Sequence, residues 1–409
     1  MKLLFITPHY FPDGGPSAPL YSMLCEELAR RGHDVNVICA VPHYPSGKTP
    51  QNYKSFKIYK EFNKGVNIIR VPLPSIDRKN LKLRFLQFIC FQLGAVLAGL
   101  RTKYDVVISS NPALQIGLPF LFFGKFRNKP SIFSVHDFYP DVGIKLGIFK
   151  SNFIVFIVDI LERMCFKSAT KIRVLSESFI PKVNCKGIER SKICLIYDWV
   201  DPNFIKPIQK ENKFSKSFNL INKFVILYAG NIGFSQGLEY LLEAAETLSN
   251  EKDIMFVLVG DGPNKDNLIN LANEKQIKNV IFIGYQPREK LPEVLAAADI
   301  SIITLKKNIS FESLPSKTYS IMASGRPIIG CLDEGSDSYN LILRSGGGIC
   351  IPPEDPNKLA EVIIKLKADK KMREAMGRKG RDYIEKFHSP KYAADRYEYI
   401  IEKLVKNKY

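Results

Sequence analysis

The stretch that decides the fold is FVILYAGNIGFSQG, residues 224–237. It opens with a short apolar run, reaches Gly230 and Gly233 at once, and leads into a segment with helical spacing of apolar residues over 237–249. A short strand that is apolar throughout belongs in a parallel sheet covered on both faces, and a glycine turn between strand and helix is typical of a βαβ unit. The stretch therefore predicts a doubly wound α/β domain.

The same alternation of short apolar runs and helical segments continues on both sides of this stretch. Residues 202–223 interrupt it, because they are rich in Lys, Asn and Pro and have no clear period, which indicates a linker. We expect two Rossmann-like domains, 1–201 and 224–385, that face a cleft, and a helix over 386–409 that packs back on the first domain. The other expected strands are 3–7, 35–41, 67–72, 105–111, 130–137, 170–176, 193–200, 255–262, 279–285, 300–305, 326–331 and 348–352.

Length and composition exclude several classes of protein. The 409 residues suffice for two or three domains, and 45% hydrophobic with 24% charged residues is ordinary for a globular chain. The eight cysteines form no C-x-x-C pair, which favours the reduced thiols of a cytosolic protein over a zinc or disulfide framework. Pro8 breaks the first apolar run and no stretch of 18 apolar residues follows, so we expect neither a signal peptide nor a spanning helix.

Positive charge is concentrated in the first half of the chain. The net charge is +18, and residues 48–103 hold twelve basic residues against Glu61 and Asp77. Such a surface predicts an anionic partner (lipid headgroups, nucleic acid or a phosphorylated substrate), although a merely solubilising face is the alternative. Residues 83–100 are apolar between basic flanks and 121–129 are aromatic and basic, as in an interfacial membrane segment. A helix over 83–100 would also suit a protein core.

Glycine-rich turns after the expected strands are candidates for phosphate binding, because glycine lets a ligand approach the backbone closely. Gly14-Gly15 follows the first strand, but it does not match G-x-G-x-x-G, which argues against a nicotinamide cofactor. In the second half, backbone amides and the side chains of Asn231 and Gln236 could hold phosphate oxygens. The turn at Gly260-Asp261-Gly262 could support a flat base. Ordinary tight turns remain the alternative for each.

Two further segments carry side chains suited to chemistry. His136 ends an apolar strand and could donate a hydrogen bond to a substrate oxygen, or it could simply cap the strand. Lys317 begins an expected helix, where a cation opposes the helix dipole unless an anion binds there. Glu312 precedes it in a loop and could accept hydrogen bonds from hydroxyl groups.

Taken in order, the motifs resemble those of retaining glycosyltransferases of the GT-B type, in family 4, and within it the bacterial enzymes of O-antigen, capsule and exopolysaccharide assembly. The resemblance covers nearly the whole chain. Its motifs are GG (14–15), LARRGHDV (28–35), HDFYPD (136–141), E-R-x5-A (162–169), YAGNIGFSQGLE (228–239), VGDGP (259–263), FIGY (282–285), AADI (297–300), ESLPSK (312–317) and MASGRPII (322–329).

The resemblance implies that a nucleotide sugar lies on the C-terminal domain and the acceptor on the N-terminal one. It places Gly15 and Lys317 near the donor diphosphate, Glu312 at the donor sugar and His136 at the reacting centre. Ser320 stands where the family has the second glutamate of Glu-x7-Glu, and Lys317 with Arg288 would replace missing basic residues of the 231–236 loop. The other implied donor-binding residues are Asn231, Gly233, Gln236, Gly260, Asp261, Gly262, Tyr285, Ser313, Leu314, Pro315 and Ser316.

The expected function is therefore transfer of a sugar from a UDP-sugar to a polyprenyl-diphosphate-linked sugar, with retention of configuration, at the cytoplasmic face of the cell membrane. No cofactor or metal is expected, since the sequence holds no D-x-D. One alternative is an inactive, membrane-bound nucleotide-sugar-binding protein. The other, a nucleic-acid binder, lacks a recognisable recognition module.

Overall fold

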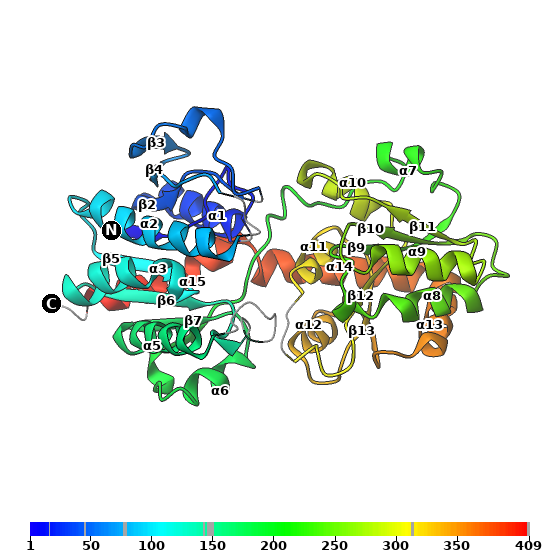
Figure 1. Cartoon of the computed structure of the whole chain (residues 1–409). Helices are drawn as coiled ribbons and strands as arrows, with labels where there is room; N and C mark the ends of the chain where they lie inside the picture. Colours follow the sequence, from blue (N-terminus) through cyan, green and yellow to red (C-terminus); the bar gives the residue numbers. More distant parts are fainter. Residues whose placement is uncertain are drawn as a thin grey trace. The chain divides into compact units, whose positions relative to one another are not determined.

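The chain forms two compact units, each built around its own sheet (Figure 1). The first holds Met1–Asp198 and Pro390–Tyr409, and the second holds Trp199–Ser389. The computed structural model describes residues 1–15, 17–44, 46–76, 80–141, 144, 151–311 and 315–406.

Within the described residues, the sheet of the first unit has eight strands in the order β3-β4-β2-β1-β5-β6-β7-β8. Neighbouring strands are parallel except β3 and β4, which are antiparallel. The strands are β1 (Lys2–Ile6), β2 (Asp34–Ala40), β3 (Tyr59–Asn63), β4 (Val66–Val71), β5 (Val106–Ser110), β6 (Ser131–Val135), β7 (Lys171–Val174) and β8 (Ile193–Leu195).

Helices cover both faces of this sheet. α2, α3 and α5 lie side by side in one layer, and α1 packs with the C-terminal helix α15 in the other (Figure 1). The helical elements are α1 (Ala18–Arg30), η1 (Gln51–Tyr53), α2 (Leu81–Gly99), α3 (Ala113–Leu121), the π-helical η2 (Phe122–Phe126), α5 (Asn152–Ser168), α6 (Phe179–Asn184), η3 (Arg190–Lys192) and α15 (Pro390–Lys406).

The second unit has a wholly parallel sheet in the order β11-β10-β9-β12-β13-β14. Its strands are β9 (Phe224–Ala229), β10 (Ile254–Val259), β11 (Val280–Ile283), β12 (Ile300–Thr304), β13 (Ile328–Cys331) and β14 (Gly348–Ile351). Its helical elements are α7 (Lys213–Ser217), η4 (Phe234–Gln236), α8 (Leu238–Thr247), α9 (Lys265–Glu274), η5 (Arg288–Lys290), α10 (Leu291–Ala296), α11 (Lys317–Ala323), α12 (Asp337–Ser345), α13 (Pro356–Ala368) and α14 (Lys370–Phe387).

The apolar strands explain why this sheet is buried on both faces. Along β9, Ile226 and Tyr228 join a cluster with α8 and α13, while Val225 and Leu227 join a cluster with α10 and α11 on the other face. Alternate residues of β9 are therefore buried on opposite faces of the sheet, which is why the strand sequence shows no alternation of polar and apolar residues. The predicted α/β fold is confirmed.

The C-terminal helix belongs to the first unit although its sequence follows the second. Tyr397 of α15 is fully buried, and its hydroxyl lies 3.1 Å from the hydroxyl of Ser134 on β6. At the surface, Glu398 accepts a hydrogen bond of 2.7 Å from Nε2 of His33 and also pairs with Arg31. The first unit is therefore completed by α15, which follows the second unit in sequence.

One strand was not predicted from the sequence. β3 (YKEFN) forms an antiparallel hairpin with β4 through a turn in which Lys64 and Gly65 have φ of 47° and 82°. It is the edge strand of the sheet, and its residues are mostly exposed. An exposed edge strand needs no apolar run, so the sequence carries little signal for it.

In the part of the chain that the structure describes, no helix is long and apolar enough to cross a membrane.

Candidate active site

Two glycine turns form a closely packed floor at the carboxyl ends of β9 and β10. Gly230 and Gly260 have φ of +148° and +143°, and a Cβ on Gly260 would lie 1.9 Å from the carbonyl oxygen of Gly230. The turns are also joined by backbone hydrogen bonds, from Gly230 N to Val259 O and from Ile232 N to Asp261 O, both 2.9 Å. A side chain at Gly262 would lie 2.3 Å from Ile232 O. These glycines are therefore required by packing.

Lys317 is the first residue of α11, the helix that follows β12 in the chain, and its side chain reaches this floor. Its Nζ lies 3.9 Å from the centre of the Tyr228 ring and donates a hydrogen bond of 2.8 Å to the Tyr228 hydroxyl. A Cβ on Gly230 would lie only 3.0 Å from this nitrogen, so glycine makes room for the ammonium group. Among the described residues no carboxylate forms an ion pair with Lys317, and burial lowers its pKa to about 7.

Tyr228 was not among the site residues predicted from the sequence. Its hydroxyl lies 2.6 Å from the carbonyl oxygen of Asn231 and 3.2 Å from Oε1 of Gln236, and it accepts the Lys317 hydrogen bond. It thus joins the lysine to the loop after β9. The sequence indicates its role in only one way: it is an aromatic residue, two positions before Gly230, on a strand that is otherwise aliphatic after Phe224.

The next turns along this edge are held together by Asp261. Its Oδ1 pairs with Nζ of Lys265 at 2.8 Å, and its Oδ2 accepts a hydrogen bond of 3.3 Å from the backbone of Tyr285. The Tyr285 side chain is 72% exposed, so its ring is available for stacking. The guanidinium of Arg288 lies 5.4 Å from the Phe204 ring.

The segment before α11 is described only from Pro315 onward. Pro315 accepts hydrogen bonds from the backbone and hydroxyl of Thr318, which start the helix, while Ser316 is exposed and Ser320 is half-buried one turn later. Asn231 is exposed and Gly233 buried in the loop after β9. The predicted residues Glu312, Ser313 and Leu314 lie outside the described residues, and their roles stay predictions.

In the first unit, His136 follows β6 at the carboxyl edge of the sheet. Its backbone N donates a hydrogen bond of 2.9 Å to Oδ1 of Asn111, and its Nε2 lies 3.3 Å from the hydroxyl of Tyr21. Burial lowers the pKa of His136 to about 4. The imidazole is therefore neutral near pH 7 and can exchange hydrogen bonds there without carrying a charge.

A buried carboxyl group is linked to His136 through the side chain of Asn111. Glu162 of α5 accepts hydrogen bonds from Nδ2 of Asn111 at 3.1 Å and from the backbone of Ala113 at 3.0 Å. Burial raises the pKa of Glu162 to about 7. Because Asn111 in turn holds the backbone of His136, Glu162 is a positioning residue for the histidine. The sequence shows it only as part of the E-R-x5-A motif.

The loop that carries Gly15 is fixed by Asp13. The buried Asp13 carboxylate accepts backbone hydrogen bonds of 2.7 Å from Gly15 and 3.0 Å from His43, and Nδ1 of both His9 and His43 lies 3.3 Å from it. His9, Asp13 and His43 thus offer ligand atoms within 4.8 Å of one another, as a metal site does, but the carboxylate already joins two loops. A Cβ on Gly15 would lie 2.2 Å from Cγ of His9.

Two family models match the chain in succession. "Glycosyl transferase 4-like domain" matches residues 17–199, and "Glycosyl transferases group 1" matches residues 209–383. The chain is a group 1 glycosyltransferase. The family, the GT-B fold and the enzyme class predicted from the motifs are thereby confirmed.

Relatives of this glycosyltransferase include the putative colanic acid biosynthesis glycosyl transferase WcaI of Escherichia coli K12. It is 26% identical over 373 residues, which cover 89% of this chain and 91% of the relative. The N,N'-diacetylbacillosaminyl-diphospho-undecaprenol alpha-1,3-N-acetylgalactosaminyltransferase of Campylobacter jejuni is 25% identical over 66% of this chain and 69% of its own length. Among solved structures, Anabaena HepE in complex with UDP-glucose aligns with a TM-score of 0.70 at 15% identity, over 98% of this chain and 100% of that one.

Proposed function

We propose that this glycosyltransferase moves a sugar from a UDP-sugar to a polyprenyl-diphosphate-linked sugar, with retention of configuration, during assembly of a surface polysaccharide. The observation that carries the donor half is Lys317, an amine enclosed at the carboxyl edge of the sheet that donates a hydrogen bond to the Tyr228 hydroxyl and lies over the Tyr228 ring. Such a group is stabilised in its charged form when an anion binds. The UDP-glucose complex of HepE and the names of the bacterial relatives support the donor, the acceptor and the pathway class.

In this proposal Lys317 and backbone amides of the glycine turns hold the donor diphosphate. Negative charge grows on the diphosphate as the bond to the sugar breaks, and fixed donors aimed at that charge stabilise the transition state. Charge neutralisation is assigned to these groups, so the scheme requires neither a metal nor a cofactor. Gly260, Gly262 and Tyr285 would flank the base, and Glu312 would hold the donor sugar.

We propose that the anomeric configuration is retained because the reaction is a front-face displacement. The bond between the anomeric carbon and the diphosphate oxygen breaks, the acceptor hydroxyl forms the new bond on the same face, and its proton passes to the departing diphosphate. His136 is neutral, and it would donate or accept a hydrogen bond at the reacting centre without adding charge.

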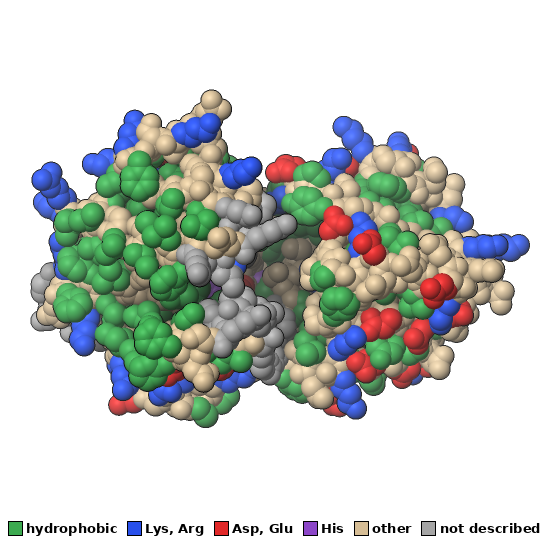
Figure 2. Space-filling model, viewed as in Figure 1, with side chains coloured by type: hydrophobic (Ala, Val, Ile, Leu, Met, Phe, Trp, Pro, Cys, Tyr) green, Lys and Arg blue, Asp and Glu red, His purple; other side chains and the backbone are tan. Residues whose placement is uncertain are grey.

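The acceptor half rests on an apolar surface of the first unit. One face of α2 is buried through Gln87, Phe91 and Ala95, and Gly94 packs so closely that a Cβ would lie 2.4 Å from Cγ1 of Val71. The other face is exposed, and hydrophobic side chains also gather over α5 in the same layer (Figure 2). The exposed residues are Leu83, Phe85, Leu86, Ile89, Leu93, Leu97 and Leu100 of the α2 segment, and Phe153, Ile154, Phe156, Ile160 and Met164 of α5.

We propose that this α2–α5 face docks peripherally on the cytoplasmic leaflet, where a polyprenyl-linked acceptor resides. An apolar surface of this extent is unusual on a monomeric soluble protein, and basic residues around it favour anionic lipid. Asp substitutions at Leu93 and Leu97 should abolish sedimentation with vesicles while donor binding persists, because neither residue lies in the second unit.

The function is tested in two stages. Thermal unfolding across UDP-, GDP- and dTDP-sugars should single out a UDP-sugar, since a ligand at 100 times its Kd adds about 2.7 kcal/mol of stability. Transfer of radiolabel from that donor to a polyprenyl-diphosphate-linked saccharide, followed by analysis of the anomeric configuration, tests the reaction. Donor binding without transfer to any lipid-linked saccharide would favour the inactive-binder alternative, and stabilisation by a GDP- or dTDP-sugar alone would overturn the UDP assignment.

A further inference from the structure

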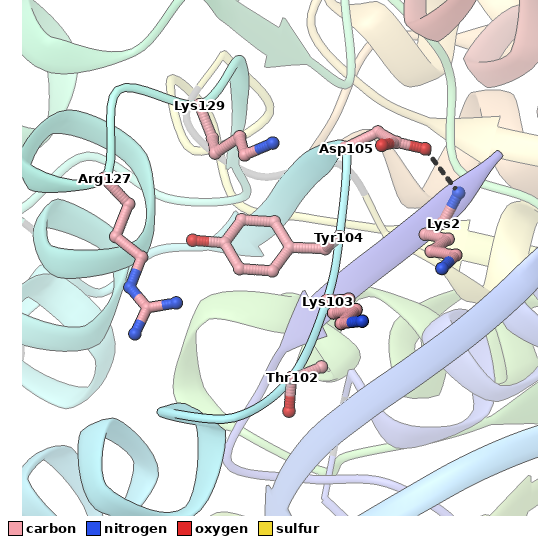
Figure 3. Close-up of a pocket in the computed structure, with 7 residues that line it drawn as sticks. All are labelled: Lys2, Thr102, Lys103, Tyr104, Asp105, Arg127 and Lys129. Carbon is pink, nitrogen blue, oxygen red and sulfur yellow. Dashed lines mark hydrogen bonds between the residues drawn. The ribbon is translucent and has the colours of Figure 1, made fainter.

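A concave site lies in the first unit, at the amino edge of its sheet. It is a pocket of about 420 Å³ lined by Lys2, Lys103, Tyr104, Asp105, Arg127 and Lys129, among others (Figure 3). Lys2 opens β1, Asp105 directly precedes β5, and Lys129 lies just before β6. His136 follows β6 at its carboxyl end, so the pocket is on the opposite edge of the sheet from the proposed reacting centre.

Hydrogen bonds and ring contacts hold two residues of the pocket wall, Tyr104 and Arg127. Tyr104 is 5% exposed, and its hydroxyl donates a hydrogen bond of 2.7 Å to the carbonyl oxygen of Phe123. Arg127 is fixed by a hydrogen bond of 2.8 Å from Nη2 to the carbonyl oxygen of Leu100 and by the Phe122 and Phe123 rings, 5.5 and 5.8 Å from the guanidinium. These contacts hold the guanidinium at the rim of the pocket.

The charge of the pocket is strongly positive. Four basic side chains line it against a single carboxylate, and Asp105 is already engaged by the backbone N of Lys2 at 2.8 Å. In the described structure, Lys2, Lys103 and Lys129 form no ion pair through their ammonium groups. Four cations around one carboxylate leave a net positive charge, and a phosphate group reduces the remaining repulsion between the cations with charge-assisted hydrogen bonds.

The pocket also adjoins the apolar α2–α5 face. Arg127 donates a hydrogen bond to the carbonyl of Leu100 directly after α2. Leu97 in the last turn of α2 is 66% exposed, and Phe126, next to Arg127 in sequence, is 74% exposed. A basic hollow at the end of an exposed apolar helix matches an amphiphile that has a phosphate at its head and an acyl chain behind it.

We infer that this pocket binds the headgroup phosphate of an anionic phospholipid while the exposed end of α2 enters the acyl region. The inference rests on the membrane docking in the proposed function and deepens it, because it names one lipid class and one binding site. The bound lipid would hold the end of the α2–α5 face that lies beside the pocket against the bilayer surface. No chemical step occurs there.

The test compares two charge-matched double variants of the full chain. Lys103→Glu/Lys129→Glu alters the pocket, and Lys54→Glu/Lys60→Glu makes the same change of net charge at exposed positions of the same unit outside it. Partition onto vesicles of phosphatidylcholine with phosphatidylglycerol should fall at least about 30-fold for the pocket variant, because the loss of two basic residues alone is worth this much and the new carboxylates add repulsion, and it should fall by much less for the control. Thermal unfolding should show that both variants fold.

Three results would overturn the inference. Equal losses of vesicle binding for the two variants would mean that the membrane attracts the basic surface in general and not this pocket. Equal binding of the wild type to vesicles with and without phosphatidylglycerol would show that binding does not require an anionic phospholipid. Loss of vesicle binding in Leu93→Asp/Leu97→Asp but not in the pocket variant would leave the docking face standing and refute the headgroup pocket. Sugar transfer to a detergent-dispersed acceptor does not require vesicle binding. Measuring it therefore tests the proposed reaction independently of the proposed lipid site.

Discussion

Lys317 should be a residue that destabilises the empty enzyme and binds the donor, and replacing it with methionine separates the two effects. Burial lowers its pKa to about 7 from the ordinary value of 10.5. Between these two values the unfolded chain holds a proton that the folded protein has partly released, so stability rises with pH across this range. At or below pH 7 the folded protein bears the energetic cost of the buried charge.

That cost sets the size of the effect. A pKa displaced this far corresponds to at most about 4 kcal/mol at pH 7, an upper value because the Tyr228 ring favours the charged form. Lys317→Met retains the length and apolar stem of the side chain without the charge. We therefore expect the variant to melt several degrees higher than the wild type at pH 7, and the difference to shrink as the pH approaches 10.

Donor affinity should respond to pH in the opposite direction. The diphosphate binds the charged form, and above pH 7 the free enzyme loses that form about tenfold per pH unit. The Kd for the UDP-sugar, measured calorimetrically from pH 6 to 8.5, should therefore rise towards tenfold per unit above pH 7. Lys317→Met should bind weakly with no such slope, and Lys317→Arg, which stays charged, should also lose the slope.

The reasoning is refuted if Lys317→Met binds the UDP-sugar as tightly as the wild type does. A flat affinity profile for the wild type, together with an unchanged melting temperature for the variant, would show that the amine is neither desolvated nor in contact with the diphosphate.

Four other outcomes are expected. Glu312→Ala should lose most turnover with its melting temperature unchanged, because we propose that it holds the donor sugar, and a rate within about threefold of wild type would exclude that role. His136→Ala should lower kcat for transfer, whereas a change confined to the donor KM would make it a binding residue only. Gly260→Ala should destabilise the second unit by more than about 1 kcal/mol in denaturant unfolding, because its Cβ would lie 1.9 Å from Gly230 O and its φ is +143°; unchanged stability would contradict the packing argument. Glu398→Gln should cost about 1–2 kcal/mol at pH 7 by weakening the bonds to His33 and Arg31, and the difference should vanish in acid, where the wild-type carboxylate is also protonated; a difference that persists in acid would point to packing instead.

The sequence predicted the features that depend on neighbouring residues. Each buried strand is a local apolar run, and each glycine turn directly follows its strand, so both sheets and the turns at Gly230 and Gly260 could be located without coordinates. β3 could not, because an exposed edge strand lacks an apolar pattern.

The side-chain partners could not be predicted, because they join residues distant in sequence. Tyr228 and Lys317 are 89 positions apart, and Glu162 and Asn111 are 51 positions apart. Their meeting depends on the order of strands in each sheet and on which helix follows which strand. A single sequence gives the members of such a pair but not their contact.

The return of α15 to the first unit bears on how the protein is made. Met1–Asp198 leaves the ribosome first, but the unit lacks the helix that carries Tyr397 until Pro390–Tyr409 has been synthesised. The second unit is continuous in sequence, from Trp199 to Ser389, and all of its strands are available earlier. Domains generally fold as units during synthesis, which extends the chain by about 5–20 residues per second. The half of the enzyme that is begun first is therefore finished last, and a nascent chain interrupted anywhere before residue 390 exposes the surface that α15 should cover to chaperones and proteases.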